Sequence, residues 1–190
     1  MAGETRTVSG KGTGELKAKG IVLIVLLLAG LVILFFEIRK QETPPSSPTI
    51  GLDAPELALR DASGKTFTLA ALKGSVVFIN FWASWCPPCK EEIPSIQMLY
   101  QHFRDDGRFR MLTVLYKDEY QKAIAILRQN NYDFPVLTDT DGRTASFYGL
   151  TGVPETYIVD KKGVLREKVI GPADWASPQT IGLISDLIKE

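Results

Sequence analysis

The sequence predicts an α/β domain in which helices pack around a central mixed sheet. From residue 50 onward, apolar runs typical of strands alternate with segments that have helical spacing. This part of the chain, about 140 residues, has the size of one compact domain. Hairpin patterns near its start and close to its end flank the alternating region. The order of these elements therefore indicates an α/β sandwich with a mixed sheet.

Each expected element has its own signal in the sequence. A hairpin is expected around the turn residues 61–64, and the apolar run at 76–82 predicts a buried strand. Ala123, Ile124 and Leu127 share one face of an expected helix. We expect, in order, strands at Glu56–Arg60 and Thr66–Thr68, a strand at Val76–Trp82, a helix at Pro87–Arg104, a strand at Phe109–Tyr116, a helix at Glu119–Asn130, a strand at Phe134–Thr138, a helix at Thr144–Tyr148, a hairpin of Thr156–Asp160 and Val164–Ile170, and a helix at Pro178–Lys189.

A long apolar segment precedes this domain. Gly20–Phe36 contains 17 consecutive apolar residues, which span about 25 Å as a helix and come near the lower limit for crossing a bilayer. More basic residues precede the run than follow it directly, so the N-terminus is expected in the cytoplasm. A cleavable signal peptide is the alternative, but the run is long for one and no small-residue cleavage site follows it. We expect a cytoplasmic tail at 1–19 and a single-pass transmembrane anchor at 20–38.

Residues 39–49 form the expected linker between the anchor and the domain. This segment is rich in proline and serine and has no large apolar side chain between residues 40 and 49. The domain itself, residues 50–190, carries 16 Lys and Arg against 18 Asp and Glu, a net charge of 16 − 18 = −2. This balance gives no support to nucleic-acid binding.

The two cysteines of the chain form a Cys-x-x-Cys pair, Cys86 and Cys89, where the buried strand passes into a helix. The N-terminus of a helix stabilises a thiolate, which is the nucleophilic form of cysteine. Residues three apart share a helix face, so Cys89 can resolve a mixed disulfide formed at Cys86. Pro87 and Pro88 fit the first turn, where proline loses no hydrogen bond. The pattern favours thiol-disulfide exchange.

Two plainer interpretations of the cysteine pair remain open. A purely structural disulfide would close a very short loop, which restricts the unfolded chain little. A zinc site normally needs four ligands, and the chain offers only His102 besides the two cysteines as a typical partner. His102 is expected on the surface of the helix, so no metal site is predicted.

The segment around the cysteines, Trp85-Cys86-Pro87-Pro88-Cys89-Lys90 after an apolar strand, resembles the active site of the thioredoxin superfamily. More narrowly it is similar to the membrane-anchored thiol-disulfide oxidoreductases of the TlpA and ResA type. Gly152-Val153-Pro154-Glu155-Thr156 resembles the cis-proline loop of that family, and Pro94 matches the kink in its active-site helix. The resemblance implies a thioredoxin-like three-layer sandwich. It further implies substrate contacts from the residues beside the cysteines and in the loop: Trp85, Pro87, Pro88, Val153, Pro154 and Glu155.

The resemblance also raises the question of which group exchanges protons with Cys89. Minimal thioredoxins have a buried aspartate where this chain has Asn80, and asparagine cannot take up a proton at neutral pH. Glu92 lies three residues after Cys89, and proteins of the ResA type carry a functional glutamate at the matching position. The alternative for Glu92 is a solvated helix face. Glu92 is our candidate catalytic carboxyl, with Glu155 as the second choice.

The expected function is that of a membrane-tethered oxidoreductase with its catalytic domain outside the cytoplasm, in the periplasm. The resemblance implies reduction of protein disulfides such as those of apocytochrome c, with electrons from a membrane protein of the DsbD or CcdA kind. The Cys86–Cys89 pair is the only redox group expected, without a separate cofactor. Two other functions remain as alternatives, a copper metallochaperone of the Sco type and a peroxiredoxin-like thiol peroxidase.

Overall fold

The computed structural model describes residues 24–34 and 48–190. Residues 24–34 form a helix. Within these described residues, no helix is both long enough and apolar enough to cross a membrane. The predicted tail at 1–19, the ends of the predicted anchor at 20–38 and most of the predicted linker lie outside the described residues. The domain that follows is described by itself.

The domain is built on a seven-stranded sheet with the order β2-β1-β5-β4-β3-β6-β7. The three strands in the middle, β3, β4 and β5, run parallel to each other, whereas the strands on both sides pair in antiparallel fashion. The sheet is therefore mixed, as predicted. The strands are β1 (Ala58–Arg60), β2 (Thr66–Thr68), β3 (Val76–Trp82), β4 (Phe109–Leu115), β5 (Val136–Thr138), β6 (Glu155–Val159) and β7 (Leu165–Ile170).

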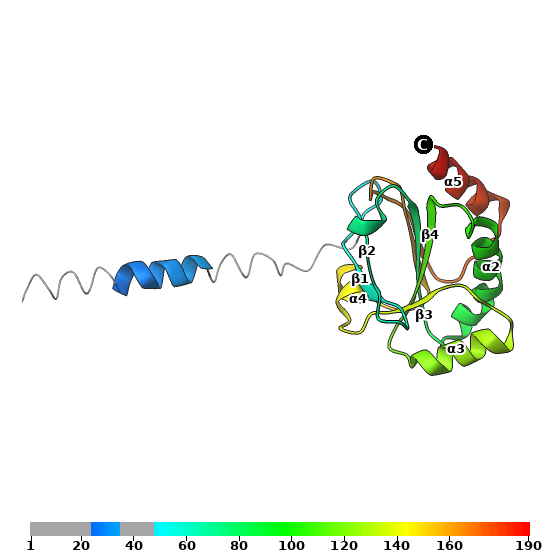
Figure 1. Ribbon diagram of the computed structural model, residues 1–190, viewed down its shortest axis with the longest axis horizontal. Helices are drawn as coiled ribbons and strands as arrows, with labels where there is room; N and C mark the ends of the chain where they lie inside the picture. Colours follow the sequence, from blue (N-terminus) through cyan, green and yellow to red (C-terminus); the bar gives the residue numbers. More distant parts are fainter. Residues whose placement is uncertain (1–23, 35–47) are drawn as a thin grey trace, which may run out of the picture. The chain divides into compact units, whose positions relative to one another are not determined.

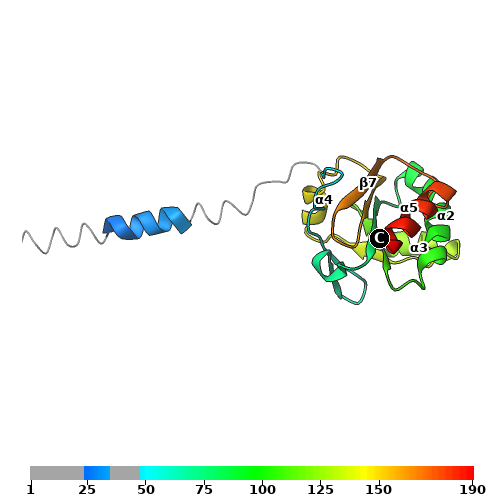
Figure 2. The same cartoon turned by 90° about the horizontal axis from the view of Figure 1, so that it is seen from above.

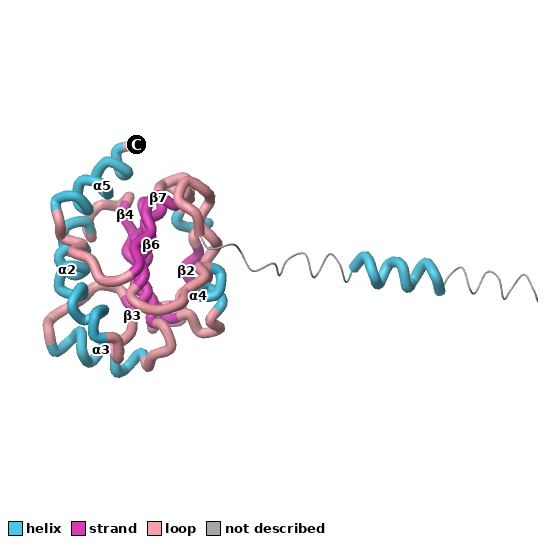
Figure 3. Tube along the Cα trace, turned by 180° about the vertical axis from the view of Figure 1, so that it is seen from behind, coloured by secondary structure: helices cyan, strands magenta, loops and turns pink. Residues whose placement is uncertain are grey.

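Helices cover both faces of the sheet, which makes three layers. One face packs against α2 (Pro87–Phe103), α3 (Tyr120–Gln129) and α5 (Pro178–Lys189), as Figures 1 and 3 show. The other face carries the short helix α4 (Arg143–Phe147). Figure 2 shows α4 on the side of the domain away from α2 and α5. The thioredoxin-like sandwich expected from the sequence is confirmed.

Strand β3 is the centre of the domain, and all seven of its residues are buried. A strand covered on both faces needs a continuous apolar run, because alternate side chains point to opposite faces. Phe78 and Trp82 point toward the layer of α2, whereas Ile79 and Phe81 point toward the layer of α4. The same alternation places Asn80 on the α2 face. This face is the one on which the cysteines lie.

The predicted elements agree with the observed ones within one or two residues. Strand β1 begins at Ala58, two residues later than predicted, and β5 begins at Val136 rather than at residue 134. Pro135 explains the second difference, since proline has no N–H to donate to the ladder. Pro94 lies inside α2, at the position expected from the resemblance.

Candidate active site around the Cys86–Cys89 disulfide

Cys86 and Cys89 form a disulfide with an S–S distance of 2.08 Å and a Cα–Cα distance of 5.3 Å. Cys86 is the N-cap of α2, and its Sγ accepts a hydrogen bond of 3.2 Å from the backbone N–H of Cys89. Both cysteines are buried, with exposed fractions of 2% and 0%. Pro87 and Pro88 occupy the first turn of the helix.

This location favours negative charge on Cys86. The N–H of Cys89 already points at its sulfur, and the positive end of the α2 dipole adds to the effect. When the disulfide is reduced, the same N–H can stabilise a Cys86 thiolate without any movement of the backbone. The geometry therefore suits Cys86 to the role of the attacking sulfur, with Cys89 deeper in the domain as the resolving one.

The loop before β6 lies against the disulfide. The peptide bond between Val153 and Pro154 is cis, as the resemblance implies. The carbonyl oxygen of Val153 lies 3.5 Å from Sγ of Cys86. A disulfide sulfur has no proton, so this is a contact in the oxidised form, and only a Cys86 thiol could donate to that oxygen. Strand β6 pairs with β3, which brings the loop to the end of β3 where α2 begins.

An apolar surface surrounds the buried disulfide. The side chain of Trp85 is 51% exposed, and its Nε1 donates a hydrogen bond of 3.1 Å to the carbonyl oxygen of Lys117. Pro87 is exposed, whereas Pro88 and Val153 are half-buried. Exposed apolar groups around a reactive centre are typical of a surface that contacts another protein. The structure thus brings Trp85, Pro87, Pro88 and Val153 to the surface beside the disulfide, whereas Pro154 is buried.

Glu92 is buried, with an exposed fraction of 2%, so the alternative of a solvated helix face is wrong. Its Oε1 accepts a hydrogen bond of 2.9 Å from Nδ2 of Asn80. Its Oε2 accepts from Nε1 of Trp175 at 2.9 Å and from the N–H of Ala173 at 3.3 Å. Burial raises the pKa of Glu92, and these three hydrogen bonds oppose the rise only in part. Glu92 is therefore a carboxyl suited to holding a proton one helical turn from Cys89.

Glu155 lies on the other face of the sheet. It is opposite Phe81 in the β3–β6 ladder, and Oε1 accepts a hydrogen bond from the hydroxyl of Tyr157 at 2.7 Å. Nζ of Lys168 pairs with the same oxygen at 3.1 Å. Neighbouring residues of a strand point to opposite faces, so the side chain of Glu155 points away from the α2 face that carries the cysteines. This placement corrects the expectation that Glu155 contacts substrate or accepts a proton from Cys89.

Trp175 and Thr156 belong to the surroundings of Glu92, although the sequence patterns gave neither of them a role there. Trp175 is buried between α2 and β3, packs edge-on against Phe78 and donates to Glu92 from 83 positions away in the chain. Thr156 Oγ1 accepts a hydrogen bond of 2.8 Å from Asn80. No local spacing links Trp175 to Glu92. The position of Thr156 in the β3–β6 register, opposite Asn80, would have revealed it if that register had been known.

Glu92 also lines a groove of about 450 Å³ between α2 and the loop that follows β7. Pro94, Ser95 and Met98 form the α2 side, and Ala173 and Asp174 form the other side. Met98 is 59% exposed. The buried carboxyl therefore has an open groove beside it, between α2 and the loop after β7.

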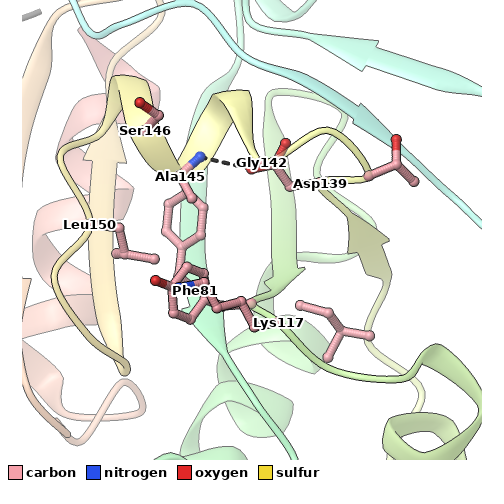
Figure 4. A pocket seen from close by; sticks show the side chains of 10 residues that line it. Phe81, Lys117, Asp139, Gly142, Ala145, Ser146 and Leu150 are labelled. Carbon is pink, nitrogen blue, oxygen red and sulfur yellow. Dashed lines mark hydrogen bonds between the residues drawn. The ribbon is translucent and has the colours of Figure 1, made fainter. Parts of the chain in front are cut away.

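A second pocket, of about 480 Å³, lies beside α4 (Figure 4). It is lined by Phe81 and by α4 and the segments beside it, with Lys117 and Asp139 as its charged residues. Asp139 already accepts hydrogen bonds from the N–H groups of Thr144 and Ala145. None of the predicted site residues lines this pocket, so it is separate from the redox centre.

His102 lies on the exposed surface of α2, as predicted. It is 13 residues beyond Cys89 on the same helix, about 20 Å along the helix axis. The two sulfurs and this histidine therefore do not converge on one metal ion. Within the described residues there is no group of three or more His, Cys, Asp and Glu side chains that could hold a metal.

Comparisons with known proteins agree with this geometry. The AhpC/TSA family matches residues 50–168. The chain is 32% identical to the thiol-disulfide oxidoreductase ResA of Bacillus subtilis over 155 residues, which cover 80% of this chain and 82% of that protein. It is also 32% identical to the thiol:disulfide interchange protein DsbE of Allochromatium vinosum over 164 residues, covering 83% of this chain and 88% of that protein.

Solved structures agree as well. The crystal structure of a candidate thiol:disulfide interchange protein DsbE from Chlorobium tepidum superimposes with a TM-score of 0.65 at 27% identity, covering 75% of this chain and 99% of the other. A protein from Bacteroides thetaiotaomicron superimposes with a TM-score of 0.68 at 23% identity, covering 75% and 92%, which supports the fold. The chain belongs to the AhpC/TSA family and is a thiol-disulfide oxidoreductase of the ResA and DsbE type.

Proposed function

We propose that this oxidoreductase is tethered to the cell membrane, that its catalytic domain works on the extracytoplasmic side, and that it reduces disulfides in other proteins. The observation that carries the proposal is Cys86, which caps α2 beside the cis-proline loop and within an exposed apolar surface. Such a surface suits a protein substrate better than a small thiol. The apolar run at 20–36 and the basic residues before it support the tether and its orientation.

In the reductive direction the reaction starts from the dithiol. The Cys86 thiolate attacks a substrate disulfide, a mixed disulfide forms, and one substrate sulfur leaves as a thiolate that takes up a proton. Cys89 loses its proton and attacks Cys86, which releases the second substrate thiolate and leaves the Cys86–Cys89 disulfide. Two electrons pass to the substrate. Glu92, buried one turn from Cys89, is placed to receive the proton of Cys89.

We further propose that apocytochrome c is a substrate and that a membrane protein of the DsbD or CcdA kind returns the dithiol state. Both follow from the resemblance to the TlpA and ResA group. No cofactor other than the Cys86–Cys89 pair is needed for this cycle, because each step exchanges one disulfide for another. A peptide with an oxidised Cys-x-x-Cys-His segment is the direct substrate probe. Its matched control is the same peptide with the cysteines placed so that their disulfide closes a larger loop.

The tether and the activity are tested separately. Alkaline extraction of membranes from cells that express the full chain should leave it in the membrane fraction, and a C-terminal tag should be open to protease only from the extracytoplasmic side. The wild-type chain should reduce the Cys-x-x-Cys-His peptide faster than the control peptide, and Cys86→Ser should abolish the reaction. Undiminished reduction by Cys86→Ser would overturn the proposed role of Cys86.

The two alternative functions have direct tests. The distance of His102 from the cysteines along α2 gives no support to a shared copper site, and equilibrium dialysis with copper(I) checks this. Peroxide consumption by the reduced protein checks the peroxidase alternative. Rates well above those of disulfide reduction would favour it.

A further inference from the structure

The side-chain amide of Asn80 is completely buried between Glu92 and Thr156, yet it makes hydrogen bonds on one side only. Its Nδ2 donates to Glu92 Oε1 at 2.9 Å and to Thr156 Oγ1 at 2.8 Å. Its Oδ1 is buried and has no hydrogen-bond partner in the described structure. A buried amide oxygen without a partner is unusual, because leaving such a group unpaired is unfavourable.

The two oxygens of Glu92 have different surroundings. Oε2 accepts from Trp175 and Ala173, whose N–H groups can only donate, so a proton on Oε2 would face two donors. Oε1 faces only the amide of Asn80. A proton taken up by Glu92 therefore belongs on Oε1.

A proton on Oε1 conflicts with the observed orientation of Asn80. The O–H of a neutral Glu92 would point at the N–H of the amide, and two donors cannot bond to each other. If the amide turns by 180° about its last side-chain bond, Oδ1 replaces Nδ2 and accepts from the O–H. Thr156 adapts without moving, because its hydroxyl can accept from Nδ2 or donate to Oδ1. Both orientations make the same two contacts, but the observed one leaves only Oδ1 unpaired, whereas the turned one leaves the N–H donors of Nδ2 without an acceptor. The turned orientation is therefore favoured only while Glu92 carries a proton that Oδ1 can accept.

We propose that Asn80 is a positioning residue whose amide turns when Glu92 gains or loses its proton, and that it holds the carboxyl in one place in both states. When Glu92 is ionised, its Oε1 accepts a hydrogen bond from Nδ2 of Asn80. When Glu92 is neutral, its O–H donates to Oδ1 of Asn80. The aspartate of minimal thioredoxins is thus replaced by Asn80, which neither gains nor loses a proton but hydrogen-bonds to Glu92 in both of its protonation states. Burial, which raises the pKa of Glu92, is consistent with a carboxyl that changes state during the cycle.

The charged groups near Glu92 are few. Glu91 and Asp174 line the groove beside it, from α2 and from the loop after β7, and both are exposed. Strands β3 and β6 contribute only the neutral Asn80 and Thr156 at this point. In the oxidised protein Cys86 and Cys89 do not titrate, so the oxidised form isolates the titration of Glu92.

The test is a pH titration of the oxidised full chain by nuclear magnetic resonance, with carbon-13 and nitrogen-15 labels. We expect contacts between the Nδ2 protons of Asn80 and the side chain of Thr156 to be present at high pH and lost at low pH. The midpoint of that change should equal the midpoint of the Glu92 carboxyl carbon. Glu91→Gln and Asp174→Asn should leave it in place. Contacts that persist through the titration of Glu92 would overturn the proposal.

Two variants sharpen the test. Glu92→Gln presents a permanent N–H donor in place of the neutral carboxyl O–H, so Asn80 should show the low-pH pattern at every pH; the high-pH pattern in this variant would contradict a turning amide. Asn80→Ala removes support for both states and should change the pKa of Glu92 less than Trp175→Phe, which removes a fixed donor to the carboxylate. An equal rise in the pKa of Glu92 in Asn80→Ala and in Trp175→Phe would show that Asn80 is a fixed donor and would overturn the proposal. These readouts do not use activity, so they do not depend on the proposed substrate.

Discussion

Replacing Trp175 by phenylalanine should destabilise the domain more than the loss of apolar contact alone explains. Trp175 is 2% exposed, and its Nε1 donates at 2.9 Å to the buried carboxyl of Glu92. Phenylalanine keeps an aromatic ring beside Phe78 but has no donor. Glu92 then has to hold its charge in the domain interior with one hydrogen bond fewer.

The size of the effect follows from the charge on Glu92. A hydrogen bond to a charged group contributes about 1.5 to 3 kcal/mol, and one between neutral groups about 1 kcal/mol. We therefore expect Trp175→Phe to lose about 1.5 to 3 kcal/mol from this bond while Glu92 is ionised. The loss should fall to about 1 kcal/mol at pH values where Glu92 is neutral.

Trp82→Phe is the matched control. Trp82 is 1% exposed on the same face of the sheet, but its Nε1 has no hydrogen-bond partner in the described structure. The two substitutions remove the same atoms, so packing losses are comparable and only Trp175→Phe loses a bond to a carboxylate. Urea unfolding of the oxidised chain in a nonionic detergent, followed by circular dichroism across a range of pH, gives both free energies of unfolding. Equal losses for the two variants at every pH would refute the role assigned to Trp175.

Three further predictions concern the buried charges. Glu92→Gln should slow disulfide exchange. Because burial raises the pKa of Glu92 above 4.5 in the native state, the native state binds more protons than the unfolded state. The stability of the wild type should therefore fall relative to this variant as pH rises above 4.5. Lys168→Met should cost about 3 kcal/mol in thermal or urea unfolding, since it leaves Glu155 buried without its cation, and should leave the exchange rate unchanged because Glu155 lies across the sheet. Burial alone would raise the pKa of Asp160, but hydrogen bonds from two backbone N–H groups and from Arg166 outweigh burial and hold it below 3.8; Asp160→Asn should therefore cost about 2 kcal/mol near neutral pH, and the difference from wild type should vanish as acid protonates Asp160.

Most elements of the fold could be predicted from local patterns in the sequence. The apolar run at 76–82, interrupted only by Asn80, predicted a buried strand, and this strand is the centre of the sheet. The proline pair after Cys86 marked the start of α2 to the residue. Such signals are local because strand pairing, helix periodicity and proline geometry act over a few residues.

The surroundings of Glu92 could not be predicted in the same way. Its position three residues after Cys89 was visible, but its burial depends on Trp175 and Ala173, which reach it from a loop more than 80 positions away. Glu155 shows the opposite error, because its place beside the cis proline suggested the active site while the alternation of β6 turned its side chain to the other face. Both outcomes depend on tertiary register, which local spacing does not encode.

The most direct test of the central claim is to trap the reaction halfway. The reduced Cys89→Ser variant should accumulate a mixed disulfide with an oxidised Cys-x-x-Cys-His peptide, and mass spectrometry of the digested adduct should place the bond at Cys86. The reduced Cys86→Ser variant should trap little or none, because Cys89 lies within the first turn of α2, whereas Cys86 caps the helix and its sulfur accepts the N–H that stabilises a thiolate. Equal trapping by the two variants, or adducts formed chiefly at Cys89, would contradict the assignment of Cys86 as the attacking sulfur.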